Sequence, residues 1–229
     1  RLPTPSGEWR WMRCRGYVHS PPEGRALEIF GSITDVTEQH AIIELSGECA
    51  ADLLPIAPPV EPNGVVSQDG YHLVKLPGDR PRYWVLADPQ SMLALWQEAA
   101  QTATPTSRDS WALLDIRAGL PTVYAATREA FVPQMANLQL IDGVSFTKGC
   151  YTGQEVVARM QYLGKLKRRM YRVTCSQRPH IGQELFAQSS ASGQGAGRVV
   201  DAAPSPSGGY EALIIAPISS AEAGDLQLD

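Results

Sequence analysis

One of the four cysteines of this chain lies in the segment KGCYTGQEVVAR, residues 148–159. Thr152 and Glu155 have the T-x-x-E spacing of a capping box, in which each side chain accepts a hydrogen bond from the other residue's backbone amide. Apolar side chains then recur at helical spacing and end at a glycine. The segment therefore predicts a helix that begins near Thr152, with Cys150 two residues before its start.

A thiol in that position is suited to act as a nucleophile or a metal ligand. The start of a helix carries partial positive charge, and Lys148 adds a cation nearby. Both influences favour the thiolate, which is the reactive form. The alternative is that Cys150 is a small buried hydrophobic residue, as free cysteines often are. On the reactive interpretation we expect an exposed Cys150 that alkylates faster than Cys14, Cys49 and Cys175.

Composition and charge narrow the class of protein. The chain has 229 residues, of which 43% are hydrophobic and 19% charged, as in ordinary globular proteins. Its net charge of −4 predicts no general attraction to polyanions, and its apolar runs are too short to cross a bilayer. We therefore expect neither membrane association nor direct nucleic-acid binding.

The cysteines and histidines are scattered along the chain. No CxxC pair and no Cys/His cluster occurs in the sequence, so we expect no structural zinc site. Four cysteines are also few for a disulfide-stabilised scaffold of this length, which favours a reducing compartment, the cytoplasm.

The chain divides into three stretches of different character. Residues 1–39 contain two alternating segments around a PPEGR turn and predict a β-hairpin. Residues 40–165 mix strands and helices, as in an α+β body. Residues 166–229 hold four short strand-like segments separated by Gly/Ser/Pro turns, which predicts a small antiparallel β-barrel. The four segments are RMYRVTC, QELFA, GRVVDAA and YEALIIAPI.

Two helices are expected in the α+β body besides the one near Thr152. Asp88 and Pro89 are suited to the cap and the first position of a helix. Ser110 is suited to cap a second helix, WALLDIRA, which Gly119 stops. The side chains expected to face the core from the first helix are Met92, Leu93 and Trp96.

The motif VSFTKGCYTGQEVVAR, with SWALLDIRAGLPTV and FVPQMANLQLIDG before it, resembles the YgfZ-type folate-binding proteins. These are relatives of the glycine-cleavage aminomethyltransferase. The resemblance covers residues 40–229 and implies an aminomethyltransferase-like fold, in which a ferredoxin-like α+β body is followed by a small C-terminal antiparallel β-barrel.

The same resemblance implies a function. Proteins of this family are implicated in assembly or repair of iron–sulfur clusters, including those of enzymes that modify tRNA, and they bind tetrahydrofolate. Carried over, Cys150 is the residue on which activity depends, and folate and iron–sulfur client proteins are the partners. A cleft beside helix 150–160 would hold the folate. The motif residues expected around it are Lys148, Tyr151, Gln154 and Glu155.

This chain departs from the family pattern in two places. Aminomethyltransferases commonly carry a pterin-binding glutamate where Arg117 stands here, and an arginine has no acceptor for the N–H groups of a pterin. Arg117 would instead attract the glutamate tail of folate. The family's N-terminal GQ-x-T-x-DV stretch is not found, and residues 1–39 resemble the C-terminal hairpin of PAS sensor domains. We therefore expect weaker folate binding.

The basic stretch KLKRRMYR, residues 165–172, has two interpretations. It could contact phosphates of tRNA or the glutamate tail of a folate. The interpretation that we favour here is an edge strand that charge protects from aggregation.

Three function classes remain open. The first is a folate-binding accessory factor for iron–sulfur proteins that acts through Cys150. The second is a folate-dependent aminomethyltransferase, although that family usually has an Asp-Phe pair at the position of the cysteine. The third is a sensory or interaction module, which residues 1–39 alone indicate. Whether the chain is an enzyme is left open.

Overall fold

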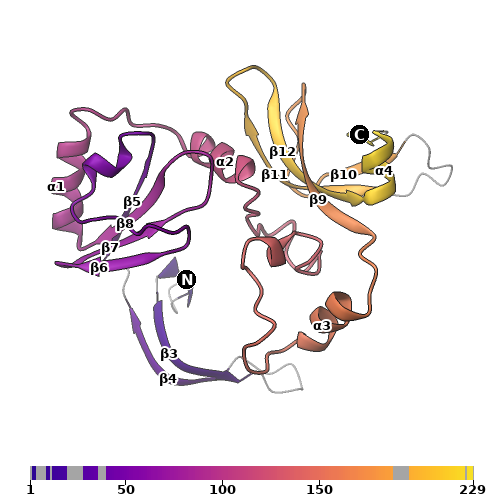
Figure 1. Ribbon diagram of the computed structural model, residues 1–229, viewed down its shortest axis with the longest axis horizontal. Helices are drawn as coiled ribbons and strands as arrows, with labels where there is room; N and C mark the ends of the chain where they lie inside the picture. The colour runs from indigo at the N-terminus through magenta and orange to yellow at the C-terminus, as the bar shows by residue number, and fades with distance from the viewer. Residues whose placement is uncertain are drawn as a thin grey trace. The chain divides into compact units, whose positions relative to one another are not determined.

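The computed structural model describes residues 40–187, 196–224 and 226–228, together with the backbone of four strands between residues 2 and 35. It forms two compact units, Arg1–Pro105 and Thr106–Asp229, which are described separately (Figure 1). The units divide the chain at a different place from the expected boundary after residue 165. Residues 106–165 fall in the second unit, in which helix α2 packs against β11 and β12.

The N-terminal strands of the first unit are two antiparallel pairs. Strand β1 (Leu2–Pro3) pairs with β2 (Trp9–Arg10), and β3 (Met12–His19) pairs with β4 (Glu28–Asp35) along their whole length. The backbone thus confirms a hairpin within residues 1–39. Its expected PPEGR turn lies outside the described residues.

A four-stranded antiparallel sheet follows in the first unit. Its strands are β5 (Ala41–Ser46), β6 (Val65–Gln68), β7 (Tyr71–Lys75) and β8 (Arg82–Ala87), in the order β5-β8-β7-β6. Strand β6 is not predicted from the sequence. The residues that could have indicated it are Asp69 and Gly70, whose φ angles of 51° and 82° form the two-residue loop of a tight hairpin.

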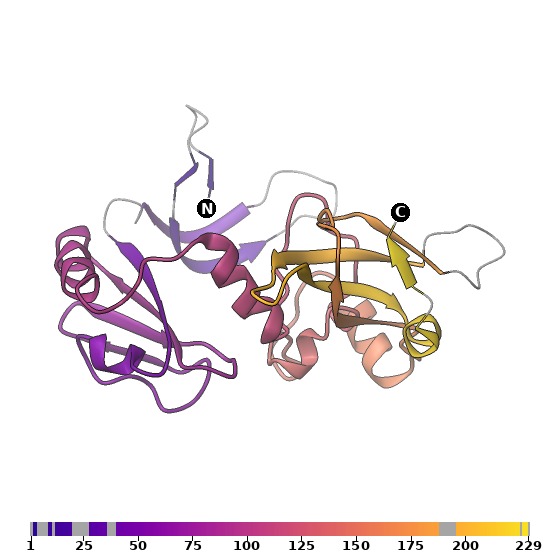
Figure 2. The same cartoon turned by 90° about the horizontal axis from the view of Figure 1, so that it is seen from above.

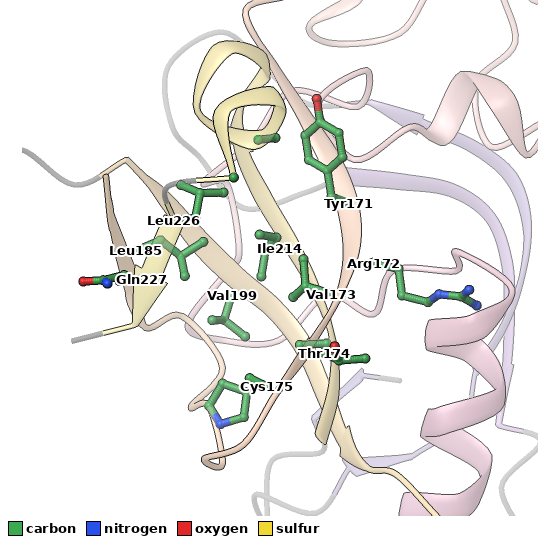
Figure 3. Close-up of a pocket in the computed structure, with 14 residues that line it drawn as sticks. Tyr171, Arg172, Val173, Thr174, Cys175, Leu185, Val199, Ile214, Leu226 and Gln227 are labelled. Atoms are coloured by element: carbon green, nitrogen blue, oxygen red, sulfur yellow. The ribbon is translucent and has the colours of Figure 1, made fainter. Parts of the chain in front are cut away.

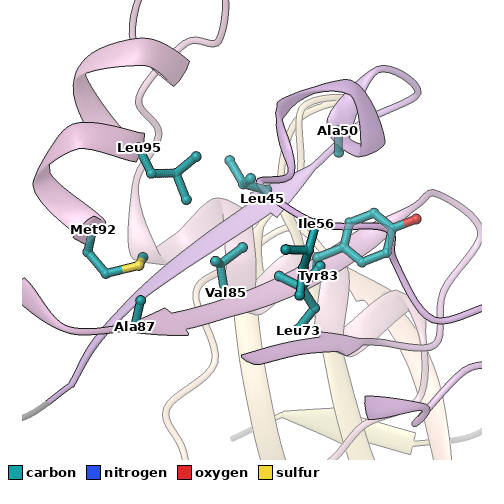
Figure 4. Close-up of a cluster of buried hydrophobic side chains, with 9 residues drawn as sticks. All are labelled: Leu45, Ala50, Ile56, Leu73, Tyr83, Val85, Ala87, Met92 and Leu95. Carbon is teal, nitrogen blue, oxygen red and sulfur yellow. The ribbon is translucent and has the colours of Figure 1, made fainter. Parts of the chain in front are cut away.

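Helix α1 (Pro89–Ala99) covers one face of this sheet (Figure 4). The predicted cap is confirmed, because Asp88 Oδ1 accepts from the amides of Gln90 and Ser91 at 2.9 and 3.1 Å. The predicted core face is wrong at two positions, since Leu93 and Trp96 are 57% and 47% exposed. The buried positions follow the i, i+3, i+7 spacing of one helix face instead. They are Met92, Leu95 and Ala99.

The second unit is built on a five-stranded antiparallel sheet in the order β13-β10-β11-β12-β9. Strand β12 (Tyr210–Pro217), which lies between β11 and β9, alternates between two hydrophobic clusters. Leu213 and Ile215 lie in one, and Ala212, Ile214 and Ala216 lie in the other. The remaining strands are β9 (Arg168–Cys175), β10 (Glu184–Ala187), β11 (Gly197–Pro204) and β13 (Leu226–Leu228).

Helix α2 (Arg108–Arg117) lies on one face of this sheet (Figure 2). Its N-cap is Ser107, whose Oγ accepts from the amide of Ser110 at 3.3 Å, so the helix begins earlier than predicted and Ser110 is inside it. The other helices of the unit are α3 (Gln154–Tyr162) and the short α4 (Ile218–Ala223). Two 3-10 turns complete the described helices, Ala50–Leu53 and Leu138–Leu140.

The α+β class and the antiparallel C-terminal strands are confirmed. The finer expectations, a ferredoxin-like body and a closed barrel, are not, because β9 and β13 are edge strands among the strands that the structure describes. None of the described helices is both long and apolar enough to cross a membrane.

A buried carboxylate lies beside a β-bulge in β11. The register between β11 and β12 shifts between Val199 and Asp201, and Asp201 is only 1% exposed. Its oxygens accept from the Tyr124 hydroxyl at 3.1 and 3.2 Å and from the Ala202 amide at 2.8 Å. Burial raises the pKa of Asp201 above its ordinary value of 3.8, because the desolvation of the charged form outweighs these hydrogen bonds.

The raised pKa of Asp201 predicts a pH-dependent stability. A carboxyl group whose pKa is raised on folding contributes to the free energy of unfolding through its protonated form. This contribution is complete below pH 3.8 and is lost as pH rises through the folded-state pKa. Asp201→Asn keeps an acceptor and stays neutral, so it should raise the free energy of unfolding at pH 7 by about 1 kcal/mol, with the gain vanishing towards pH 4. Urea unfolding at several pH values measures this, with exposed Glu222→Gln as control. A variant that is less stable at every pH would contradict the prediction.

Candidate functional site

The start of α3 is a glycine turn, and the predicted capping box is wrong. The helix begins at Gln154, its N-cap is Gly153, and no side chain caps it. Gly153 has φ 87° and ψ 0°, and the amide of Gln154 donates to the carbonyl of Tyr151 at 3.1 Å, which is the geometry of a type II turn. Thr152 cannot act as N-cap because the turn places it before Gly153, outside the first helical turn.

Cys150 is exposed and free, as expected of a reactive thiol. It lies four residues before the first residue of α3 rather than two, so it is beyond the first helical turn, to which the dipole's effect is confined. Lys148 is exposed too, with its Nζ 4.8 Å from the centre of the Tyr151 ring. Cys49 is also exposed and Cys175 is half-buried, whereas the side chain of Cys14 is outside the described residues. The faster alkylation of Cys150 stays a prediction.

The segment between α2 and α3 holds the motif in place through two amide side chains. Gln134 is 2% exposed, and its Nε2 donates to the carbonyl of Val157 in α3 at 2.7 Å. Asn137 donates through Nδ2 to the carbonyl of Met170 in β9 at 2.9 Å. Sequence reasoning missed both roles. Both amides lie in FVPQMANLQLIDG, a segment that lacks the periodicity of a helix or a strand. Polar groups in and around such a segment need side-chain partners, and this need was the available signal.

Arg117 lies at the end of α2 and forms an ion pair with Glu211 of β12. Nε is 3.0 and 3.2 Å from the two carboxylate oxygens, and Nη2 is 2.5 Å from Oε1. These hydrogen bonds lower the pKa of Glu211 below its ordinary value. The Arg117 carbonyl accepts from Arg172 of β9 at 3.3 Å. The structure therefore places Arg117 beside the sheet of the second unit.

The second unit has a pocket of about 420 Å³ on the face of the sheet opposite α2. The residues that line the pocket come from several strands. Figure 3 shows Val199 and Ile214 in its middle and Cys175 at one end. Burial raises the pKa of the Cys175 thiol, which disfavours its thiolate. None of the residues that line this pocket belongs to KGCYTGQE, so it is not the expected cleft beside α3.

The residues that the structure describes hold no group of three or more His, Cys, Asp or Glu side chains arranged to bind a metal ion. Cys150 therefore belongs to no such group within that part of the chain.

No family model matches the sequence. Proteins named tRNA-modifying protein YgfZ do match it. The protein from Colwellia psychrerythraea is 43% identical over 154 residues, which is 65% of this chain and 47% of the relative. Those from Hamiltonella defensa and Pectobacterium carotovorum are 34% and 31% identical over 72% and 79% of this chain, or 52% and 56% of their own length. The chain is a relative of the YgfZ proteins. It spans about half the length of the YgfZ proteins that it matches.

A solved structure supports the fold of this YgfZ relative. The aminomethyltransferase T of the glycine cleavage system from Bartonella henselae aligns with a TM-score of 0.58 over 86% of this chain and 55% of its own. Sequence identity is 17%, so this similarity concerns the fold alone. It confirms the aminomethyltransferase-like architecture that the motifs implied.

The glycine turn of this YgfZ relative can be tested with a pair of neighbouring substitutions. Thr152→Ala should change the free energy of unfolding by less than about 0.5 kcal/mol, because Thr152 caps nothing. Gly153→Ala should destabilise by about 1–2 kcal/mol, because an L side chain is strained at φ 87°. No atom lies within 4 Å of an added Cβ at Gly153, so the loss would come from the backbone and not from a clash.

Urea unfolding followed by circular dichroism measures both values. A larger loss in the free energy of unfolding for Thr152→Ala than for Gly153→Ala would contradict the glycine turn and support the capping box.

Proposed function

We propose that this chain acts in tRNA modification as a YgfZ-type accessory factor, with Cys150 as its working residue. The observation that carries the proposal is the exposed thiol of Cys150 on the KGCYTGQE turn, in a chain related to proteins named for tRNA modification. An exposed thiol next to a surface turn can contact a protein partner, whereas a buried thiol cannot.

Iron–sulfur clusters are the chemistry that we assign to this thiol. Cysteine thiolates are the ligands that hold such clusters, usually four to a cluster. Cys150 supplies one ligand, so the client protein must supply the others, which is consistent with transient assembly or repair. Lys148, whose Nζ is 4.8 Å from the centre of the Tyr151 ring, places a positive charge two residues from the thiol in the sequence.

Tetrahydrofolate is the proposed cofactor. A pterin offers N–H donors, and the described residues include three buried amide oxygens without a hydrogen-bond partner, in Gln134, Asn137 and Gln139. The donors of a pterin match this acceptor chemistry, whereas Arg117 offers no acceptor. Of the motif residues, Gln154 and Glu155 add further acceptors beside the turn. When bound, the folate would supply one-carbon or redox chemistry.

The role of Arg117 in holding a folate tail also stays a proposal. Its guanidinium already binds Glu211, so a tail carboxylate must compete with that ion pair or share it. Lys148 is the alternative cation for the tail.

We further infer the place of each part in an aminomethyltransferase-like fold. The sheet of the second unit would be part of the C-terminal barrel, and residues 40–165 would belong to the ferredoxin-like body. We also propose that the protein works in the cytoplasm with iron–sulfur client proteins.

Cys150→Ser tests the proposed function in cells that lack their own YgfZ protein. Serine keeps the size of the side chain and removes the thiolate, so the variant should fold but lose at least about tenfold in restored tRNA modification, measured by mass spectrometry of tRNA nucleosides. Cys49→Ser is the matched control because Cys49 is also exposed. Equal restoration by both variants and the unaltered chain would remove Cys150 from the mechanism.

Calorimetric titration with tetrahydrofolate tests the cofactor. We expect binding that Gln134→Leu weakens at least tenfold, because the variant removes a buried acceptor while keeping the volume of the side chain. A second variant, Arg117→Lys, tests the contact with the tail. If Arg117 contacts the tail, the variant should lower the affinity for a polyglutamylated folate more than the affinity for a monoglutamate. Absence of heat with either folate at millimolar concentration would contradict the proposal.

A further inference from the structure

We infer that the second unit carries an RNA-binding surface, formed by the basic residues of the KGCYTGQE turn, α3 and the start of β9. Residues 144–172 contain seven basic residues and one acidic residue, although the whole chain carries a net charge of −4. All seven are exposed. We call six of them the basic ridge and set Arg172 apart because of its contact with Arg117. The ridge consists of Lys148, Arg159, Lys165, Lys167, Arg168 and Arg169.

No residue of the basic ridge forms an ion pair within the described part of the chain. The ion pairs of the second unit join Arg117 to Glu211 and Arg198 to Glu184, and neither includes a ridge residue. Arg172, the seventh basic residue, differs because it donates to the Arg117 carbonyl. The ridge therefore presents positive charge to solvent, and a polyanion is the partner that this charge fits.

Protection of a sheet edge does not account for the whole ridge. Strand β9 is an edge strand, so charge at Arg168 and Arg169 would discourage pairing with another chain. However, Lys165 and Lys167 precede the strand, and Arg159 is on α3. The cations therefore extend along a helix and a linker that have no edge to protect.

Exposed aromatic and apolar side chains lie among these cations and favour RNA over an acidic peptide. Tyr162 at the end of α3 is 70% exposed, and its ring meets Phe146 edge-on at a centroid distance of 6.2 Å. Leu163 beside it is 84% exposed. A supported tyrosine ring among lysines and arginines is the combination on which unpaired bases stack while their phosphates are neutralised.

This inference rests on the proposed function for the identity of the RNA, which is tRNA. It differs from the expectation, drawn from the net charge, that the chain does not bind nucleic acid directly. Net charge averages over the surface, whereas phosphate contacts depend on local charge within the short screening length of physiological salt.

The experiment is a fluorescence anisotropy titration of a labelled, unmodified tRNA transcript with the full chain at several salt concentrations. Six phosphate contacts predict a slope of log K against log salt of about −4 to −5. The triple variant Lys165→Ala, Lys167→Ala, Arg169→Ala should bind at least tenfold more weakly and reduce the slope by about 2–3. The matched control removes three exposed arginines elsewhere, Arg80→Ala, Arg128→Ala and Arg178→Ala, and should bind as the unaltered chain does.

Three outcomes would overturn the inference: no binding at 50 mM salt, equal losses in both triple variants, or displacement of the tRNA by a polyglutamate peptide as readily as by unlabelled tRNA. Tyr162→Ala should weaken binding about tenfold without changing the salt slope, because stacking involves no counterion release. The assay contains neither a client protein nor folate. Its failure would therefore leave the Cys150→Ser test of the proposed function untouched, and a failure of that test would leave this one valid.

Discussion

Strand β12 is buried on both of its faces, and the rest of the second unit depends on covering them. Leu213 and Ile215 require a cover on one side, and Ala212, Ile214 and Ala216 require one on the other. Helix α2 covers the first face, and the ion pair between Arg117 and Glu211 fixes the end of that helix to the same strand. The motif segment then has to leave this core and return to β9. The KGCYTGQE turn is thus held at the surface by a core that it does not join.

Amide side chains hold the site in addition to packing, in which Phe131, Met135 and Ala136 contact the core of the second unit. The segment before the motif folds through backbone turns, and Gln134 and Asn137 connect it to α3 and to β9. Each amide uses its N–H group and keeps an oxygen without a described partner. Buried oxygens in that state are costly in a folded protein. The two side chains that support the motif are therefore also those that would gain from the N–H donors of the proposed folate.

Sequence reasoning succeeded where a local signal determines a local structure. The cap of α1 at Asp88 follows from residues within a few positions of each other, and it is confirmed. The capping box at Thr152 failed because the same local sequence, T-G-Q-E, also fits a type II turn that uses Gly153 at positive φ. The ion pair of Arg117 could not be predicted, because Glu211 is 94 residues away and only the packing of α2 on the sheet brings the two together.

The distribution of charge links the exposed thiol to its surroundings. Arg117 is neutralised by a carboxylate on the sheet, whereas the cations on either side of Cys150 in the sequence, Lys148 and Arg159, have no acidic partner among the described residues. Charge that served only stability would be expected to be paired, because unpaired like charges repel one another and raise the free energy of the folded state. An anionic partner bound to the basic ridge, as we infer, would relieve this repulsion. Because Lys148 is two residues from Cys150 in the sequence, such a partner would be bound at the same turn that presents the thiol.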